Sequence, residues 1–352
     1  MNKVFRAIDL WAGLAAGLMA LFVYGYTLMP DVGLEDSGEL ITAAWNLGVP
    51  HPPGYPIWTL LAFLFSRIPV GTVAWRVNFL SAFFGAVTVG LVVSLTLAAV
   101  RVQLQSIPLF RKRLDFMQRE RLAVCVALAA GLMLTVSAGL WSQSVIAEVY
   151  SLNAFFFMGI LAMMFLWLYR PERMWAFYLM VYLFGLGLTN HQTLLLLLPA
   201  FLPPIWMNNR RLFWQLASFG CVLLGGFLWW HGMASTGIFG RLLEGAEPQG
   251  LWLFGGVILL GLAGVFGWLS GGRDGLMHPA LMLGWVLSLI LLYYGLTGSS
   301  PEYAVFEEVN GIFGRRVLLT VAGLLFPAVF GGIYWARRER FRDWHAPYVS
   351  VL

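Results

Sequence analysis

Residues 31–58 read DVGLEDSGELITAAWNLGVPHPPGYPIW, a polar and proline-rich stretch between the first long apolar run of the chain and a second, much shorter one. Three of the chain's 17 acidic residues, Glu35, Asp36 and Glu39, lie together near its start. The chain as a whole is 60% hydrophobic and only 11% charged. Carboxylates are costly beside a hydrocarbon layer, so this group of three indicates a function.

The rest of the chain consists mainly of apolar runs. An α-helix needs about 17–25 apolar residues to cross hydrocarbon, whereas the run 57–68 has only about 12 and suits a buried or interfacial helix. We therefore predict an all-α, polytopic transmembrane bundle that forms a single domain over residues 1–352. Ten runs are expected to span, with the first uncleaved because no signal-peptidase-like site follows it. They are 9–29, 77–100, 122–140, 150–169, 174–190, 191–207, 213–230, 251–269, 279–297 and 317–335.

The basic residues predict the topology. With a cytoplasmic N-terminus, the basic loop 101–121 faces the cytoplasm, as the positive-inside rule requires. The net charge of +5 comes from basic residues in short loops, where they set the topology, so nucleic acid is not an expected partner. Both termini are then cytoplasmic and residues 30–76 form an outer loop, facing the periplasm of a bacterial inner membrane. Of the 22 Lys and Arg residues, those left outside are Arg67, Arg76, Arg241, Arg315 and Arg316.

Asp36 and Glu39 have two interpretations. Asp-Ser-Gly-Glu has the spacing of a capping box, which would start a helix at residue 37 and end it near Asn46, with Gly48 as the terminating glycine. Alternatively, Asp36 is a general base for an acceptor hydroxyl or a ligand of a divalent metal, and Glu39 orients the acceptor or the base. Capping does not explain Glu35, since adjacent carboxylates repel each other near low dielectric.

The segment His51-Pro52-Pro53-Gly54-Tyr55-Pro56 is a rigid turn, because each proline fixes φ. A histidine in such a turn is more often a structural hydrogen-bonding group than a catalyst. Its closeness in sequence to the acids makes His51, together with Tyr55, a candidate for substrate binding.

Two later polar groups are expected on the same outer face. Glu148, just before the run 150–169, either complements the helix dipole or adds a second carboxylate to the Asp36 cavity. The Thr189–Thr193 segment, TNHQT, separates two apolar runs. It is either a tight turn or a place where Asn190 and His191 hold sugar hydroxyls.

Arg241, Arg315 and Arg316 depart from the positive-inside pattern. They either pair with nearby acids or bind the phosphate of a lipid carrier, for which the guanidinium is well suited.

The stretch LEDSGELITAAWNLGVPHPPGYP resembles the signature of the protein O-mannosyltransferase-like membrane family, and AEVYSLN and GLTNHQT are similar to two later motifs of that family. The resemblance covers residues 31–193 and implies a glycosyltransferase of the GT-C type. Such enzymes move a sugar, here a hexose such as mannose, from a polyprenyl-phosphate carrier to an acceptor on protein or glycan. It implies that Asp36 is the catalytic carboxylate, with Glu39, His51 and Glu148 beside it.

Many members of that family carry a soluble C-terminal domain, so we expect a partner to supply acceptor recognition or the chain to be a shortened form. The rival interpretation is a transporter or flippase of a lipid-linked glycan. Transporters usually place ionisable groups at the midplane of the membrane, whereas the acids here lie at its outer face. A passive structural subunit would leave the acidic motif unexplained.

Overall fold

A computed structural model describes residues 4–233 and 248–275 of the chain. Over these residues the chain forms helices joined by turns and loops, without a β-strand, which confirms the predicted all-α class. It divides into two compact units, Met1–Pro204 and Ile205–Leu352.

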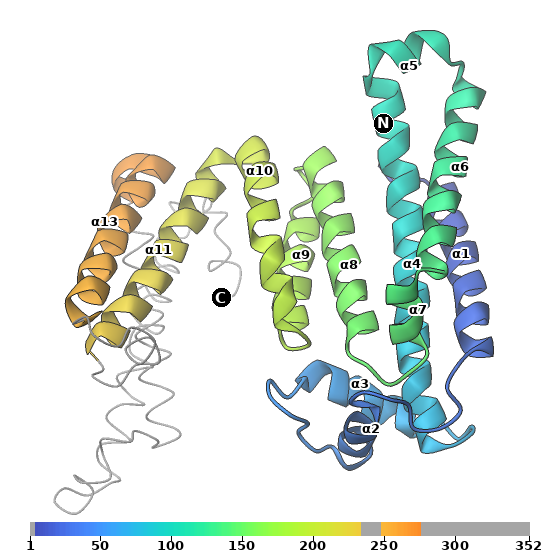
Figure 1. The fold of residues 1–352 in the computed structure, drawn as a ribbon. Coiled ribbons are helices and arrows are strands. Elements are labelled where there is room, and N and C mark those ends of the chain that lie inside the picture. Colours follow the sequence, from blue (N-terminus) through green and yellow to red (C-terminus); the bar gives the residue numbers. More distant parts are fainter. Residues whose placement is uncertain (1–3, 234–247, 276–352) are drawn as a thin grey trace, which may run out of the picture. The chain divides into compact units, whose positions relative to one another are not determined.

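The central helix of the first unit is α4 (Val73–Ser106), which packs against α1 (Ala7–Tyr26), α6 (Phe116–Thr135) and α8 (Tyr150–Tyr169) (Figure 1). Its 34 residues give it a length of about 51 Å at the usual helical rise. This exceeds the roughly 30 Å of a bilayer's hydrocarbon core. The helix can therefore cross the membrane and still carry structure beyond it.

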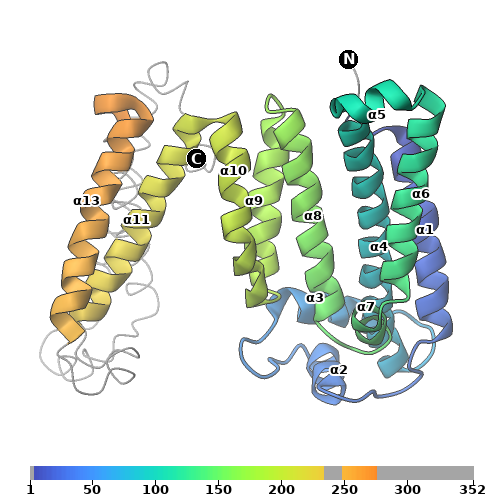
Figure 2. The ribbon, with the colours of Figure 1, turned by 45° about the horizontal axis from the view of Figure 1, so that its top comes forward.

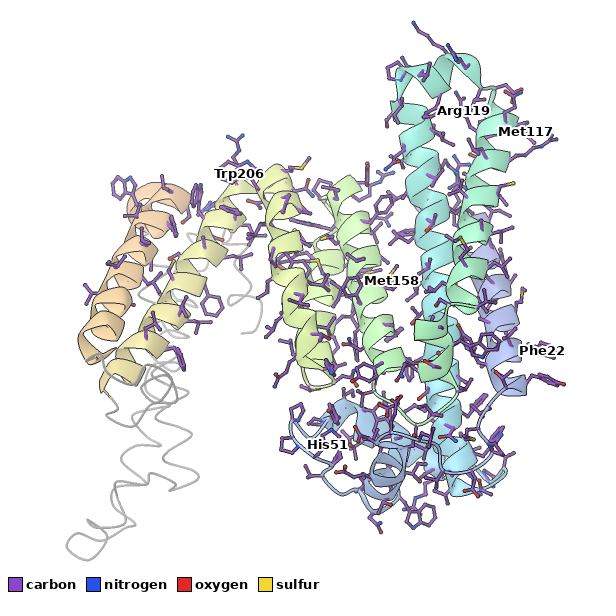
Figure 3. The ribbon with its side chains drawn as sticks, viewed as in Figure 1. Phe22, His51, Met117, Arg119, Met158 and Trp206 are labelled. Carbon is purple, nitrogen blue, oxygen red and sulfur yellow. The ribbon has the colours of Figure 1, made fainter. Side chains whose placement is uncertain are left out.

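Small residues let α1 and α4 approach closely. A Cβ atom on Gly13 would lie only 2.5 Å from the carbonyl oxygen of Gly90, so a larger residue would force the two backbones apart. Such close packing is typical of membrane helices, which associate by van der Waals contact rather than by the hydrophobic effect. The opposite face of α1 is open: Phe22 points away from the bundle and is 74% exposed (Figure 3).

Four described helices are long and apolar enough to cross a membrane: α1, α4, α8 and residues Arg210–Leu228 of α11 (Arg210–Met233). A fifth span results if α6 and α7 (Ala138–Ser144), which meet at a bend of 58°, are counted together. The predicted run 122–140 is therefore not one straight helix. The Ser137 hydroxyl accepts a hydrogen bond from the Leu140 amide and starts α7.

Of the remaining expected spans, two form shorter helices, one lies within α13 and two fall outside the described residues. Run 174–190 is α9 (Met174–Leu188), and run 191–207 is a 3₁₀ helix, η1 (Gln192–Leu197), followed by α10 (Leu198–Asn208). Run 251–269 lies within α13 (Pro248–Gly275), which packs against α11 in the second unit. There the Ser218 hydroxyl donates to the Ala263 carbonyl at 2.8 Å. Runs 279–297 and 317–335 lie outside the described residues.

The stretch 31–58 folds into a loop that carries α2 (Ser37–Asn46) and leads into α3 (Pro56–Ser66). The two helices contact each other and α4, at the end of α4 opposite α5 (Pro108–Arg113) (Figure 2). The prediction that 57–68 is a short helix is confirmed. The start and end of α2 are also as predicted, but Leu47 rather than Gly48 takes the left-handed conformation that ends it, with φ of 50°.

A buried ion network ties α1, α4 and α6 together near the other end of α4. Arg101 is 4% exposed and donates to both carboxylate oxygens of the fully buried Asp9, at 2.9 and 2.7 Å. It also donates through Nε to Glu120, at 3.0 Å to each oxygen. Arg6 completes the network with a 3.0 Å ion pair to Glu120. Arg101 thus belongs to the helix core, although the sequence placed it in the basic loop.

Removing one member of this network should destabilise the fold. Arg101→Met leaves the Asp9 carboxylate buried without a cation, and we expect a loss of about 3–5 kcal/mol. The double variant Asp9→Leu/Arg101→Met removes both charges and should lose less. Thermal unfolding of the purified protein in detergent measures the difference. Glu172→Gln is the control, because that carboxylate is 62% exposed. A double variant at least as unstable as the single one would contradict the prediction.

The predicted topology can be tested at the two ends of α4. In a background without cysteine (Cys125→Ala, Cys221→Ala), single cysteines are placed at the exposed positions Val70 and Ser106. A membrane-impermeant thiol reagent added to intact cells should label position 70 and spare position 106. The opposite labelling pattern would reverse the orientation of the bundle.

Candidate active site

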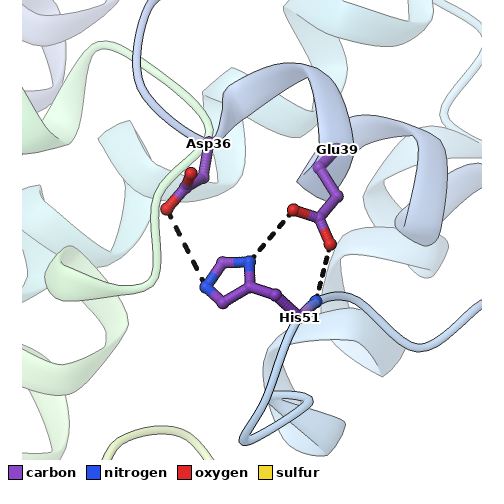
Figure 4. Close-up of side chains that lie close together, drawn as sticks. All are labelled: Asp36, Glu39 and His51. Atoms are coloured by element: carbon purple, nitrogen blue, oxygen red, sulfur yellow. Dashed lines mark hydrogen bonds and ion pairs between the residues drawn. The ribbon is translucent and has the colours of Figure 1, made fainter.

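Glu39 holds His51 with both of its carboxylate oxygens. The backbone N–H of His51 donates to Oε1 at 2.6 Å, and ring atom Nδ1 lies 3.0 Å from Oε2 (Figure 4). The side-chain hydrogen bond from His51, followed by the backbone one, lowers the pKa of Glu39 below its ordinary value. The carboxylate is therefore ionised at neutral pH, and it joins the start of α2 to the His-Pro-Pro turn.

The other ring nitrogen of His51 faces Tyr55 and Asp36. Nε2 lies 3.0 Å from the Tyr55 hydroxyl and 3.8 Å from Oδ2 of Asp36. His51 thus sits between the two acids of the motif, one at each side of the ring (Figure 4). Burial, reinforced by nearby tyrosine and carboxylate groups, raises the pKa of Tyr55, so its hydroxyl stays protonated.

The expected capping box is wrong at the level of side chains. Asp36 occupies the N-cap position of α2, but its carboxylate accepts no capping hydrogen bond, and Glu39 turns to His51 instead. Neither carboxylate therefore caps α2. Their side chains are 59% and 48% exposed, so solvent or a ligand can reach them.

The backbone of this stretch is strained. Among the described residues, the non-glycine residues with positive φ are Glu35, Leu47 and Tyr55, at 60°, 50° and 42°. Each such conformation costs of order 1–3 kcal/mol and persists only where surrounding contacts impose it, which is typical of functional sites. Glu35 lies directly before Asp36, and Tyr55 lies within the His-Pro-Pro turn.

Glu148 lies in a short buried connection between α7 and α8. Its carbonyl oxygen accepts hydrogen bonds from Trp58 Nε1 and from the Ser81 hydroxyl, both at 3.1 Å. The neighbouring Ala147 carbonyl accepts from the Ser37 hydroxyl at 3.3 Å. Helices α2, α3 and α4 therefore all bind this connection, which brings Glu148 to the acidic motif more than a hundred residues earlier.

The Glu148 carboxyl is only 3% exposed, and its Oε1 has no hydrogen-bond partner among the described residues. Burial raises its pKa to about 7, and the charges of Glu35 and Asp36 act in the same direction. Backbone N–H groups of Asp36 and Val149 oppose the shift by hydrogen bonding to the carboxylate. Because this pKa lies near neutrality, the group can either accept or donate a proton.

The Asn190-His191 turn joins the same site. Asn190 is buried, and its side-chain amide donates to the Val149 carbonyl at 3.2 Å. The His191 ring stacks on Tyr55, with the planes 7° apart and the centroids at 6.4 Å, and it also contacts Tyr150 at 5.4 Å. Burial lowers the pKa of His191, so the ring is neutral. The three motifs picked out in the sequence thus meet in one place.

Two polar residues beside His191 were missed, Thr193 in this turn and Asn153 in α8. Thr193 donates its amide to Nδ1 of His191 at 3.2 Å, and its hydroxyl lies 2.9 Å from the same atom. Asn153 donates to that hydroxyl at 3.0 Å. Both lie inside motifs quoted from the sequence, but only the fold shows that they orient the His191 ring. The predicted phosphate ligands Arg241, Arg315 and Arg316 lie outside the described residues.

A divalent metal finds a partial donor set here. One oxygen or nitrogen from each of Asp36, Glu39 and His51 lies within 4.8 Å of the others. However, the two carboxylates lie against opposite nitrogens of one ring. An ion bound at Nε2 of His51 would have Asp36 as its second ligand, and Glu39 would orient the ring through Nδ1. The three side chains therefore do not form a complete site in this arrangement.

The raised pKa of Glu148 predicts a pH dependence of stability. Between its ordinary value of 4.5 and about 7, the folded state holds a proton that the unfolded chain has lost. Stability from this group therefore falls as pH rises through that window, by up to about 1.4 kcal/mol per unit. Glu148→Gln cannot titrate, so its thermal midpoint in detergent should fall less between pH 5 and 7.5 than that of the wild type. Parallel curves would contradict the shift.

Comparison with known proteins places this chain among relatives. The family model of the protein O-mannosyl-transferase TMEM260 N-terminal domain matches residues 36–212 of the sequence. The chain is 40% identical over 154 residues to protein O-mannosyl-transferase TMEM260 of Mus musculus, which covers 41% of the chain and 18% of the mouse protein. It is 29% identical over 213 residues to protein O-mannosyl-transferase tmem260 of Dictyostelium discoideum, covering 55% of the chain and 23% of that protein. No solved structure matches.

The chain therefore spans less than a quarter of the length of either relative. The family match nevertheless begins at Asp36 and ends beyond His191, so it contains the site described above apart from Glu35. Because that match covers half of the 352 residues, this chain belongs to the family of the protein O-mannosyl-transferase TMEM260 N-terminal domain.

Proposed function

We propose that this chain is a membrane glycosyltransferase that moves a hexose such as mannose from a polyprenyl-phosphate carrier to a hydroxyl group on a protein acceptor. The observation that supports this most strongly is the meeting of Asp36, Glu39, His51 and Glu148 at one end of a bundle of apolar helices. Carboxylates and imidazole are the groups that general acid–base catalysis uses. Long apolar helices beside them suit a donor with a polyprenyl tail.

In the proposed reaction, the acceptor oxygen attacks C1 of the sugar as its proton passes to the Asp36 carboxylate. The bond between C1 and the phosphate oxygen breaks, and its electron pair leaves with the phosphate. Asp36 is the candidate base because its carboxylate is exposed and carries no capping hydrogen bond. Arg241, Arg315 and Arg316 are proposed to hold the phosphate, which gains charge as it leaves.

The remaining site residues are proposed to bind and orient the substrates. Glu148, with a pKa of about 7, can exchange a proton with a sugar or acceptor hydroxyl. Among the described residues, the buried amide oxygen of Asn190 has no donor, and His191 presents a neutral ring beside Tyr55. Such acceptors and flat rings suit the hydroxyls and faces of a hexose. Glu35 contributes negative charge that keeps the Glu148 proton in place.

We further propose that the site faces the periplasm of a bacterial inner membrane, as the basic loop 101–121 suggests. A divalent metal is an optional addition, held by Asp36 and His51. A partner protein that supplies acceptor recognition is also proposed.

Asp36→Asn tests the proposed base. The change keeps the shape of the side chain and breaks no capping bond, so the protein should fold normally. The rate of sugar transfer from a polyprenyl-phosphate hexose should fall about 10²–10⁴-fold. Asp31→Asn is the matched control, because Asp31 is an exposed aspartate in the same loop whose carboxylate accepts a hydrogen bond from the adjacent Val32 amide. Near wild-type transfer by Asp36→Asn would refute the assignment.

A further inference from the structure

The ring of His191 has its hydrogen on Nε2, because the other ring nitrogen is an acceptor. The backbone N–H of Thr193 donates to Nδ1 at 3.2 Å, and a backbone amide can only donate. The Thr193 hydroxyl lies 2.9 Å from the same nitrogen and accepts from the Asn153 amide at 3.0 Å, so its own hydrogen is available for Nδ1. Because the ring is neutral, its hydrogen lies on Nε2.

Helix capping explains only one edge of this ring. His191 is the N-cap of η1, and the bond from the Thr193 amide to Nδ1 is the capping bond. Asparagine or serine would cap a helix at least as well as histidine. In the described part of the chain, the hydrogen bonds of the ring are made through Nδ1, and none uses Nε2. The side chain is half-buried, so a ligand can reach the Nε2–H donor.

Two buried oxygens lie close to this donor. Asn190 is 1% exposed, and its amide nitrogen donates to the Val149 carbonyl, which fixes the orientation of the amide. Glu148 is 3% exposed, and its carboxylate accepts from the Val149 backbone N–H. Among the residues that the structure describes, neither Asn190 Oδ1 nor Glu148 Oε1 has a hydrogen-bond partner. A buried acceptor without a partner is unfavourable, so a ligand that donates hydrogen bonds would stabilise both.

Aromatic rings lie against the donor. Tyr55 stacks on the His191 ring with the planes 7° apart, and Tyr150 contacts the same ring with the centroids 5.4 Å apart. Tyr150 is 46% exposed, so part of this aromatic group is accessible. Binding sites for small molecules combine such apolar surfaces with a few fixed polar groups. A hexose ring matches both, since it has apolar C–H faces and hydroxyls that donate and accept.

The polarity of these groups separates the two ends of the proposed sugar donor. The oxygens of a phosphate diester can only accept hydrogen bonds, and Asn190 Oδ1 can only accept as well, so they do not match. The charges of Glu35 and Asp36 act on Glu148 and also disfavour a further anion beside it. A sugar hydroxyl can instead accept from His191 Nε2–H and donate to one of the two buried oxygens.

We propose that His191 Nε2–H, Asn190 Oδ1 and Glu148 Oε1 form the subsite for the hexose ring of the donor. This rests on the proposed transfer reaction. One hydroxyl of the hexose accepts from His191 and donates to a buried oxygen, so the subsite selects a hexose over the analogue that lacks this hydroxyl. Thr193 and Asn153 are positioning residues, which keep Nδ1 an acceptor and thereby keep the hydrogen on Nε2.

Two substitutions of His191 separate the cap from the donor. Asparagine can accept from the Thr193 amide in place of Nδ1 but has no group in the place of Nε2, so His191→Asn keeps the cap and removes the donor. This variant should unfold at the wild-type temperature. Glutamine is long enough to place an amide N–H near the position of Nε2 but is a poor N-cap. His191→Gln should therefore unfold at a lower temperature and keep the donor.

The experiment measures the Kd of two ligands in detergent, a polyprenyl-phosphate hexose and the same polyprenyl phosphate without the sugar. His191→Asn should weaken binding of the sugar-bearing carrier about 10–100-fold and leave binding of the bare carrier unchanged. His191→Gln should bind the sugar-bearing carrier more tightly than His191→Asn does. Thr193→Val should also weaken binding of the sugar-bearing carrier, and Thr193→Ser should restore it because serine supplies the hydroxyl.

Deoxy forms of the sugar-bearing carrier identify the hydroxyl that is bound. In the wild type, removal of one particular hydroxyl should weaken binding about 10–100-fold. In His191→Asn the same removal should cost much less, because the bond to that hydroxyl is already lost. Equal losses in the two proteins for every deoxy form would contradict a bond between His191 and the sugar.

Two further results would overturn the subsite while leaving the transferase function intact: His191→Asn that binds both carriers as the wild type does, or that loses affinity for both equally. Wild-type protein that binds neither carrier and transfers no sugar would instead contradict the proposed function. The Nε2–H donor is then tested without a ligand, by ¹⁵N NMR of histidine-labelled protein in detergent. The resonances lost in His191→Asn identify this ring among the five histidines. A neutral ring with its hydrogen on Nδ1 would overturn the subsite without any assay of binding.

Discussion

The first unit depends on a buried piece of backbone, Ala147–Val149, that connects α7 to α8. Peptide groups removed from water must find hydrogen-bond partners, and leaving one unpaired costs on the order of 1–3 kcal/mol. Here the partners are side chains from four separate places: Ser37, Trp58, Ser81 and Asn190. The same bonds that satisfy this connection also hold the outer loop, the central helix and the Asn-His turn against one another.

This arrangement explains why Glu148 is buried although it carries a charge. Its backbone N–H and C=O both bond the Ser81 hydroxyl, its side chain is buried, and this burial raises the pKa of the carboxyl to about 7. At the other end of α4 the protein treats buried charge differently, by pairing Asp9 with Arg101 through two hydrogen bonds. The paired charges of Asp9 and Arg101 contribute to stability. Glu148 has no such cation beside it in the described part of the chain and lies near Glu35 and Asp36, so its proton can take part in a reaction.

The loop around α2 is also strained at the site and stabilised by contacts away from it. Left-handed conformations at Glu35 and Tyr55 are unfavourable locally, yet they direct Asp36 and His51 toward each other. The hydrogen bonds that His51 donates to Glu39 and that Ser37 donates to the Ala147 carbonyl supply the compensation. The exposed acids are therefore held by contacts made behind them, and their outward oxygens remain accessible.

The sequence by itself determined the helical class, the short helices at 37–46 and near 57–68, and the three motifs of the site. Length and hydropathy carry that information, because an apolar run must be buried or lie in lipid whatever its neighbours are. It did not determine the bend after Thr135, the ending of α2 at Leu47 or the bonding of Glu39. Only the tertiary structure decided these, since a carboxylate at the third helical position can bond either to its own N-cap or to a turn twelve residues away. The choice depends on where the His-Pro-Pro turn packs, and local sequence does not encode that position.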